Sequence, residues 1–473
     1  MTAKQQAALP EADLGGSNVL FVAYFFPPTI STGVPGCMRT IKFLRNLKGG
    51  QCHVLTTPEA QLSPEQSALS HIELPVHDET IHRVASRDVF QVLLAARRSV
   101  KGLVKRGGNS GRVEPATTFR TASSATAQPD NSLPETGRFQ QMKDFIYNLC
   151  YFPDQAGPWV LPAVARARRI VREQNIDVIF ATGSPWSDLI VGYLVSRLTR
   201  TPLIVDFRDP WMNNPFHPSK GALLDAWALR WEQRIVEHAN AVSLNTEPLK
   251  QEFLQRYPRQ PADKFFVMPN GFDLADFTAS EAAVPDSRYF TLCHAGFLYG
   301  VRDPAPLLQA IEQANRQLAD SGRQIRFRQI GDIQLNYDVR ERFGALIDDG
   351  SLMLEPPQPY QQCLQALTGA DMVVNIQPAT RSQVPSKLYD YLAINRPILN
   401  ITPRDGALGT MVEEYGLGEL FDFEESEALA QRLVEIVQND EYSGSFDGYN
   451  NRSRFDSRHT AWDLTEKIKA LTS

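Results

Sequence analysis

Val19-Leu20-Phe21-Val22-Ala23-Tyr24-Phe25-Phe26-Pro27-Pro28 is the stretch of this sequence that decides the fold. Its apolar residues follow one another without a break until the two prolines, which predicts a strand buried on both faces, as in a parallel sheet. A glycine-containing loop, a helix with a basic face and the strand His53–Thr56 come next. The segment therefore predicts a β-loop-α-β unit, the building block of α/β folds.

The same alternation returns further along the chain. Residues 176–183 predict a strand, 187–199 a helix and 202–207 a second buried strand. Another block begins with the strand Tyr289–Ala295 and alternates between helices and strands up to residue 401. Such alternation predicts doubly wound parallel sheets, so the expected fold class is α/β with two Rossmann-like halves. A hinge is expected near 272–286, with ligands bound at the carboxyl ends of the strands.

Length and composition narrow the class further. The chain has 473 residues, more than one core of about 250–300 residues accommodates, so two domains are expected. The net charge of −6 excludes a protein that coats nucleic acid through overall basicity, and no nucleic-acid partner is expected. The five cysteines are scattered and form no C-x-x-C pair, which argues against a disulfide framework or zinc ribbon. The histidines are dispersed too, and no metal site is predicted.

The sequence favours a cytoplasmic protein. Residues 1–17 lack the charged-then-apolar order of a signal peptide, and no run of roughly 18 apolar residues predicts a spanning helix. Residues 88–106 predict a helix that mixes apolar and basic side chains. It is interpreted either as a solvated face or as a peripheral contact with anionic lipid on the inner face of the cell membrane. Residues 107–137 are rich in small polar residues and predict a flexible loop.

Six segments resemble glycosyltransferase family 4, whose fold is called GT-B. In chain order they are Val19–Pro28 with Gly33, Asp177–Ser187, Val205–Trp211, Val267–Asp273, His294–Pro304 and Val384–Ile398. The resemblance implies two facing Rossmann-like domains with a cleft between them. The N-terminal, acceptor-binding domain would span 17–280, with the helix in 446–473 crossing back onto it. The C-terminal domain, 281–445, would bind the nucleotide sugar.

The resemblance also implies a chemistry. A sugar leaves a nucleoside diphosphate, and the departing diphosphate gains negative charge that cations and N–H dipoles must stabilise. Family members typically manage this without a bound metal, so positive side chains are expected to replace it, and no cofactor is expected. The catalytic candidates are Arg302, after the strand at 289–295, and Lys387, at the start of a predicted helix. Relatives usually carry an additional arginine where this chain has Phe297.

Further contacts with the donor follow from the same resemblance. They are assigned to Gly296, Ser386, Leu388 and Asp390. Asp390 takes the place of a glutamate that commonly holds the ribose hydroxyls. Ser382 stands where a second glutamate is usual, which leaves the contact with the donor sugar to other groups.

Residues of the N-terminal half are expected on the acceptor side. The Gly33 loop should approach the reacting centre, because glycine lets backbone N–H groups come close to a phosphate or sugar. Arg208 and Asp209 follow a buried strand and are therefore expected at the carboxyl edge of the sheet, where they would orient an acceptor hydroxyl. An internal ion pair that fixes the loop is the alternative.

The predicted function is retaining transfer of a sugar from a nucleotide-diphosphate sugar to a glycan or lipid-linked acceptor, with surface polysaccharide assembly as the usual setting. Two other classes remain open. One is a non-hydrolysing nucleotide-sugar epimerase of the same fold. The other is an inactive nucleotide-sugar-binding scaffold, suggested by the departures at Phe297 and Ser382. The glycine fingerprint of a nicotinamide dehydrogenase is absent.

Overall fold

The chain forms two compact units. The computed structural model describes residues 11–30, 34–59, 69, 72–86, 145–214, 219–277, 286–378, 380–442 and 446–473. One unit, here called the N-terminal unit, comprises 13–243, 259–266 and 465–473, and the C-terminal unit comprises 244–258 and 267–464 together with the first residues up to 12. Gly33, the predicted helix 88–106 and the predicted loop 107–137 lie outside the described residues.

A seven-stranded sheet organises the N-terminal unit, in the order β5-β4-β2-β6-β7-β8-β9. Its strands are β2 Asn18–Val22, β4 Gln51–Thr56, β5 Thr80–Arg83, β6 Val178–Gly183, β7 Leu203–Phe207, β8 Ala241–Leu244 and β9 Phe265–Val267. β2 pairs in parallel with both β4 and β6, and every residue of β6 is buried. The strand order changes direction between β2 and β6, so this is where a doubly wound sheet opens a crevice.

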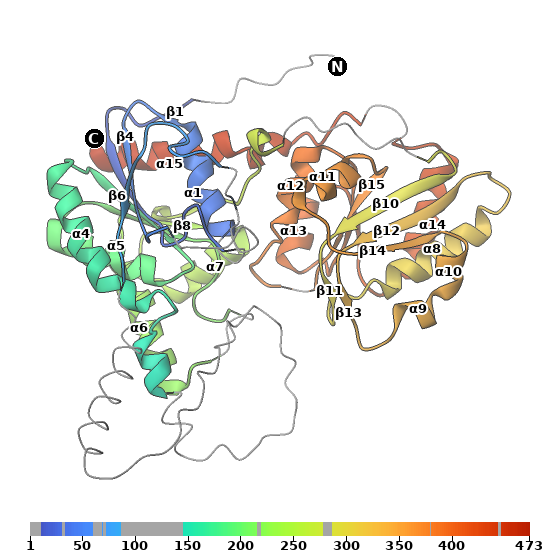
Figure 1. The fold of residues 1–473 in the computed structure, drawn as a ribbon, viewed down its shortest axis with the longest axis horizontal. Coiled ribbons are helices and arrows are strands. Elements are labelled where there is room, and N and C mark those ends of the chain that lie inside the picture. The colour runs from blue at the N-terminus through green and yellow to red at the C-terminus, as the bar shows by residue number, and fades with distance from the viewer. Residues whose placement is uncertain are drawn as a thin grey trace, which may run out of the picture. The chain divides into compact units, whose positions relative to one another are not determined.

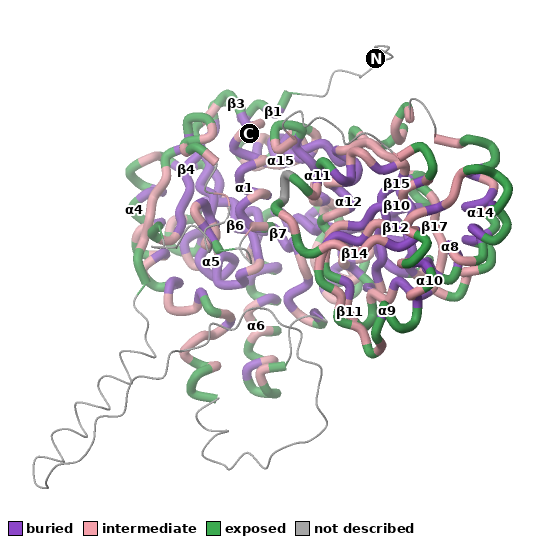
Figure 2. Tube along the Cα trace, turned by 45° about the vertical axis from the view of Figure 1, so that its right-hand side comes forward, coloured by how far each residue is buried: buried purple, intermediate pink, exposed green. Residues whose placement is uncertain are grey.

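Helices cover both faces of this sheet. They are α1 Val34–Asn46, α4 Val160–Glu173, α5 Ser187–Thr199, α6 Ala222–His238 and the end of α15 Ser457–Thr472. Figure 1 shows α4 and α5 on one side of the strands and α1 on the other, while Figure 2 shows that the strands are the most buried part. Two short strands, β1 Ala12–Asp13 and β3 Leu47–Lys48, form a separate ladder.

A six-stranded sheet organises the C-terminal unit, in the order β14-β12-β10-β15-β16-β17. Its strands are β10 Tyr289–Ala295, β12 Gln324–Ile330, β14 Leu352–Glu355, β15 Met372–Ile376, β16 Ile398–Ile401 and β17 Glu419–Phe421, and all neighbours pair in parallel. The order changes direction between β10 and β15. The short strands β11 Leu298–Tyr299 and β13 Ile333–Gln334 pair with each other beyond the ends of β10 and β12.

Two apolar clusters lie on the two faces of this sheet. One packs α8 Ala305–Gln317 and α14 Ser426–Gln438 against the strands, and the other packs α11 Tyr360–Thr368, α12 Lys387–Ile394 and α13 Ala407–Tyr415. The small helices α9 Val339–Arg342 and α10 Gly344–Asp348 border the first cluster, and α7 Glu247–Arg256 also belongs to this unit. The expectation of two doubly wound parallel sheets is therefore confirmed.

Candidate functional site

The candidate donor residues gather at the point where the order of the C-terminal sheet reverses. The loop that begins with Gly296 follows β10 and leads through β11 to Arg302, whereas α12, which begins with Lys387, lies in the connection that follows β15. Because β10 and β15 are neighbouring parallel strands, both segments leave the sheet at its carboxyl edge. Ligands of doubly wound sheets bind at such an edge.

Lys387 and Gly296 fit closely together. Gly296 has a φ of +143°, and a Cβ added to it would overlap the Lys387 ammonium. The backbone of Gly331 supports it from behind, since a Cβ on Gly331 would lie 2.7 Å from the carbonyl oxygen of Gly296. Glycine is therefore required at position 296 both by its backbone conformation and by the lysine that covers it.

Arg302 is held by an aromatic ring rather than by a carboxylate. Its guanidinium lies 5.3 Å from the centre of the Tyr299 ring, and its backbone N–H donates to the Tyr299 carbonyl at 2.6 Å. The Tyr299 ring stacks in turn on Phe297, with centroids 5.1 Å apart. The Arg302 Nε is buried without a hydrogen-bond partner. Phe297 therefore supports the platform beneath Arg302 at the position where relatives have an arginine.

The two cations lack an anionic partner in the part of the chain that the structure describes. No ion pair joins Arg302 or Lys387 to any described carboxylate. Asp303, next to Arg302 in the chain, instead accepts hydrogen bonds from the Ala305 N–H at 2.8 Å and the Tyr337 hydroxyl at 2.6 Å. An anion that entered this site would therefore meet two positive charges that no described ion pair neutralises.

The pKa of Lys387 reflects this shortage of negative charge. Burial, and then the positive charge of Arg302, lower the pKa of its ammonium from 10.5 to about 8, against an opposing effect of Asp390. The ammonium thus remains mostly protonated at neutral pH, but at a cost in free energy. A bound anion would remove that cost and raise the pKa again.

His294 and Gln329 belong to the same site, although the sequence did not single them out. They are direct neighbours in the β10–β12 register, and His294 Nδ1 lies 2.7 Å from Gln329 Oε1. Gln329 Nε2 donates to the Gly296 carbonyl at 2.7 Å, so the amide oxygen faces the histidine and Nδ1 carries the proton. Burial, and then the charge of Lys387, lower the pKa of His294 well below its usual value. His294 is therefore a neutral neighbour of the two cations.

The remaining predicted donor residues lie along the first turn of α12. Ser386 is exposed at the N-cap position and forms no side-chain capping bond. The Leu388 side chain is fully buried, and its N–H donates to the Pro385 carbonyl at 3.1 Å. Asp390 lies in the same turn as Lys387 and acts on its pKa. The structure thus brings Gly296, Arg302, Lys387 and Asp390 into one site, with Ser386 at its exposed margin.

The predicted acceptor residues have internal partners. Arg208 is buried, and its guanidinium donates from Nε to the Gly183 carbonyl at 3.2 Å and from Nη2 to the Ser184 carbonyl. A Cβ on Gly36 would lie 3.0 Å from Arg208 Nη1, so α1 also packs on this side chain. Burial lowers the pKa of Arg208, whereas Asp209 raises it. Arg208 therefore fixes the loop that follows β6, at the carboxyl edge of the N-terminal sheet.

Comparisons with known proteins point to one family over part of the chain. Residues 128–276 match the model of Glycosyltransferase Family 4. This part of the chain is therefore similar to glycosyltransferase family 4. No curated protein sequence matches the chain.

Solved structures agree with this assignment at the level of the fold. The chain resembles the N-terminal domain of a Candida albicans trehalose-6-phosphate phosphatase with a TM-score of 0.54, 12% identity and coverage of 97% of each chain. It also resembles the lipopolysaccharide outer core galactosyltransferase WaaB, with a TM-score of 0.50, 11% identity and coverage of 96% of this chain and 99% of the other. At such low identity the likeness shows the fold alone, which is GT-B.

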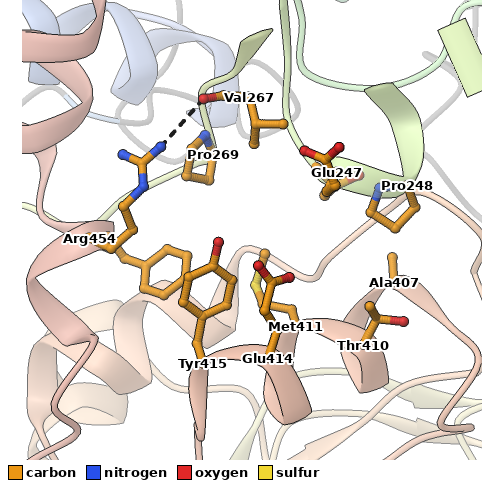
Figure 3. Close-up of a pocket in the computed structure, with 12 residues that line it drawn as sticks. Glu247, Pro248, Val267, Pro269, Ala407, Thr410, Met411, Glu414, Tyr415 and Arg454 are labelled. Carbon is orange, nitrogen blue, oxygen red and sulfur yellow. Dashed lines mark hydrogen bonds between the residues drawn. The ribbon is translucent and has the colours of Figure 1, made fainter. Parts of the chain in front are cut away.

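The chain contains a separate hollow in its C-terminal unit, with a volume of about 260 Å³. Its lining comes from α7, α13 and the segments after β9 and before α15 (Figure 3). Glu247, Glu414 and Arg454 carry charge there, but Glu247 already pairs with Lys250 at 3.3 Å and Arg454 with Asp463 at 2.6 Å. None of the candidate donor residues lines this hollow, so it is not the donor site.

The described residues meet neither the requirements of a metal site nor those of a membrane-spanning helix. No group of three or more His, Cys, Asp or Glu side chains there is placed to hold a metal ion. None of the helices that the structure describes combines the length and the apolar character needed to cross a membrane.

Proposed function

We propose that this glycosyltransferase moves a sugar from a nucleotide-diphosphate sugar to a glycan or lipid-linked acceptor, with retention of the anomeric configuration, in surface polysaccharide biosynthesis. One observation carries the proposal: Arg302 and Lys387 lie at the reversal point of the C-terminal sheet without a carboxylate partner among the described residues. A diphosphate supplies the negative charge that this site lacks.

The chain's own groups would divide the work as follows. Lys387 and Arg302 stabilise the leaving diphosphate without a metal or other cofactor, and Gly296 lets it come close to the backbone. The first turn of α12, with Ser386 and Leu388, adds its dipole. Asp390 binds the ribose hydroxyls. The acceptor hydroxyl attacks on the face from which the diphosphate departs, and the diphosphate takes up the hydroxyl proton, which gives retention.

The acceptor side belongs to the N-terminal half in this proposal. Residues 17–280, with 446–473, would bind the acceptor through Gly33, Arg208 and Asp209, and residues 281–445 would bind the donor. Because Arg208 is tied to two carbonyl groups, its role would be to hold the loop that meets the acceptor. The protein would act in the cytoplasm, with residues 88–106 as a peripheral contact with the inner face of the membrane.

The experiment begins with thermal-shift screening against a panel of nucleotide sugars, followed by turnover assays with the donor that gives the largest shift. Arg302→Ala and Lys387→Ala should each lower kcat/KM by about a hundredfold, as the loss of a transition-state charge contact does. Arg316→Ala and Lys469→Ala are matched controls, because both residues are on the surface and pair with a glutamate of their own helix. Neither control should lower the rate.

Two further readouts test the finer points. Proton NMR of the product should show the anomeric configuration of the donor, and activity should survive a chelator such as EDTA. Full activity of both active-site variants would refute their assignment. An inverted product or a rate abolished by chelation would refute retention or metal independence. Epimerised donor in the absence of acceptor would favour the epimerase instead.

A further inference from the structure

The free charge of Arg302 needs an explanation, because a carboxylate stands next to it in the chain. Asp303 follows Arg302 directly and lies in the same loop before α8. An ion pair between the two would neutralise the site, yet the structure contains none. Since Arg302 Nε is buried and unpartnered, the guanidinium would gain a bond by turning to this carboxylate.

Asp303 is held in place by two hydrogen-bond donors. Its Oδ1 accepts from the Ala305 N–H at the start of α8, at 2.8 Å, and from the Tyr337 hydroxyl at 2.6 Å. The first bond is local to the loop and the second comes from a segment 34 residues away. The tyrosine bond is therefore the one that ties the Asp303 carboxylate to the body of the unit.

Tyr337 is itself fixed by packing. It follows β13, which pairs with β11 on the loop of Arg302. Its ring lies edge-on to Phe343, with centroids 6.4 Å apart, and Arg342 lies 4.7 Å above it. It also packs against the apolar cluster of α8 and α14. Burial and the hydrogen bond to Asp303 raise the pKa of the phenol, so the hydroxyl remains a donor throughout the neutral range.

We propose that Tyr337 is a positioning residue that keeps Arg302 available to an anionic ligand, because its hydroxyl holds the Asp303 carboxylate away from the guanidinium. The Tyr299 ring supports the Arg302 guanidinium, and Tyr337 binds the carboxylate that would compete for it. The inference rests on the proposed function in one respect only, that the anion is the diphosphate of the donor.

The test is a double-mutant cycle read by binding of inorganic pyrophosphate in metal-free buffer at pH 7, with isothermal titration calorimetry. Tyr337→Phe keeps the ring but frees Asp303, so pyrophosphate affinity should fall about three- to fivefold, the strength of a partly exposed ion pair. In the Asp303→Asn background the same substitution should have no effect, because no carboxylate remains to capture Arg302.

The cycle separates positioning from simple loss of structure. If Tyr337→Phe weakened binding equally in both backgrounds, or left binding unchanged, the inference would be overturned. Tyr289→Phe is the matched control, since its hydroxyl also donates to a single acceptor, the Asp349 carbonyl, at 3.2 Å. This control should bind pyrophosphate as the wild type does.

Failure of the proposed donor site would look different. Arg302→Ala and Lys387→Ala should both reduce pyrophosphate binding by at least the factor seen with Tyr337→Phe. If neither did, the anion site itself would be misplaced, and both proposals would fall. If both did while the cycle showed no coupling, the donor site would stand and the role of Tyr337 would fall.

Discussion

The two sheets treat buried charge in opposite ways at their carboxyl edges. In the N-terminal unit, Asp206 accepts four hydrogen bonds: from Arg39 at 2.7 and 2.8 Å, from Thr182 at 2.8 Å and from Ser243 at 2.7 Å. In the C-terminal unit, Lys387 and Arg302 have no described carboxylate partner, and the pKa of Lys387 falls to about 8. The first arrangement is complete, whereas the second lacks an anion.

This difference separates structural charge from binding charge. A buried ion is tolerated when its partner and hydrogen bonds are already present, as around Asp206, and removing one partner then destabilises the fold. A buried cation without an anionic partner lowers the stability of the fold. Such a cation is therefore typical of a binding site, where the ligand supplies the negative charge. Charged residues at equivalent edges of two similar sheets should therefore respond to substitution in opposite directions.

The largest expected effect is on the paired side. Asp206→Ala removes the buried carboxylate that pairs with Arg39 and should lower the free energy of unfolding by about 3–5 kcal/mol. Urea denaturation followed by circular dichroism measures this. Ser243→Ala, which removes only one of the four bonds, should lower the free energy of unfolding by about 1 kcal/mol. If both variants lost the same free energy of unfolding, the ion pair would contribute no more to stability than a single hydrogen bond does.

Lys387→Met should act in the other direction. It removes an unpaired ammonium that lies against Gly296 and near Arg302, so at pH 7 the variant should be more stable than the wild type by about 1–2 kcal/mol. The pKa of Lys387 is about 8 when folded and 10.5 when unfolded, so the unfolded state binds more protons between these values. Wild-type stability therefore rises with pH across this window.

The stability gap between Lys387→Met and the wild type should accordingly close as the pH rises from 7 to 10, and thermal unfolding at each pH measures it. Lys469→Met, at an exposed lysine paired with Glu466, is the control and should show no such convergence. A variant that is less stable than the wild type at pH 7 would mean that Lys387 is structural. The comparison between the two edges would then be wrong.

The contrast shows what the sequence could and could not predict about the fold. The helix at 187–199 and the strands at 289–295 and 372–376 were predicted with their observed bounds, because each is a strong apolar pattern between clear breaks. The first strand is shorter than predicted: β2 ends at Val22, and the Tyr24 N–H donates to the side chain of Asp188. A continuous run of apolar residues does not show at which residue the strand ends and the chain leaves the sheet.

Contacts between residues on different strands and helices were the main feature that the sequence could not predict. Arg39 belongs to the basic face that the sequence predicts for the first helix, but it is buried and paired with Asp206, which lies 167 residues away. Gly296, Arg302 and Lys387 were all predicted as site residues, yet their contact depends on the pairing of β10 with β15. The bond between Asp303 and Tyr337 likewise depends on the pairing of β11 with β13, which no local pattern indicates.

The smallest expected effect concerns a pair of histidines whose contact is favourable only while both rings are neutral. His53 Nδ1 and His82 Nε2 lie 3.3 Å apart on β4 and β5, and Arg166 of α4 lies 3.3 Å from the other nitrogen of His82. Burial, then the neighbouring His53 and Arg166, lower the pKa of His82 from 6.5 to about 4.

Between these two pKa values the unfolded state binds more protons than the folded state, so the stability of the fold falls as the pH drops. Between pH 6.5 and 4.5 the wild type should lose about 1 kcal/mol more than His82→Phe, after allowance for solvent screening. Urea denaturation at each pH measures this difference, and parallel pH profiles of the two proteins would show that protonation of the histidine pair does not contribute to acid sensitivity.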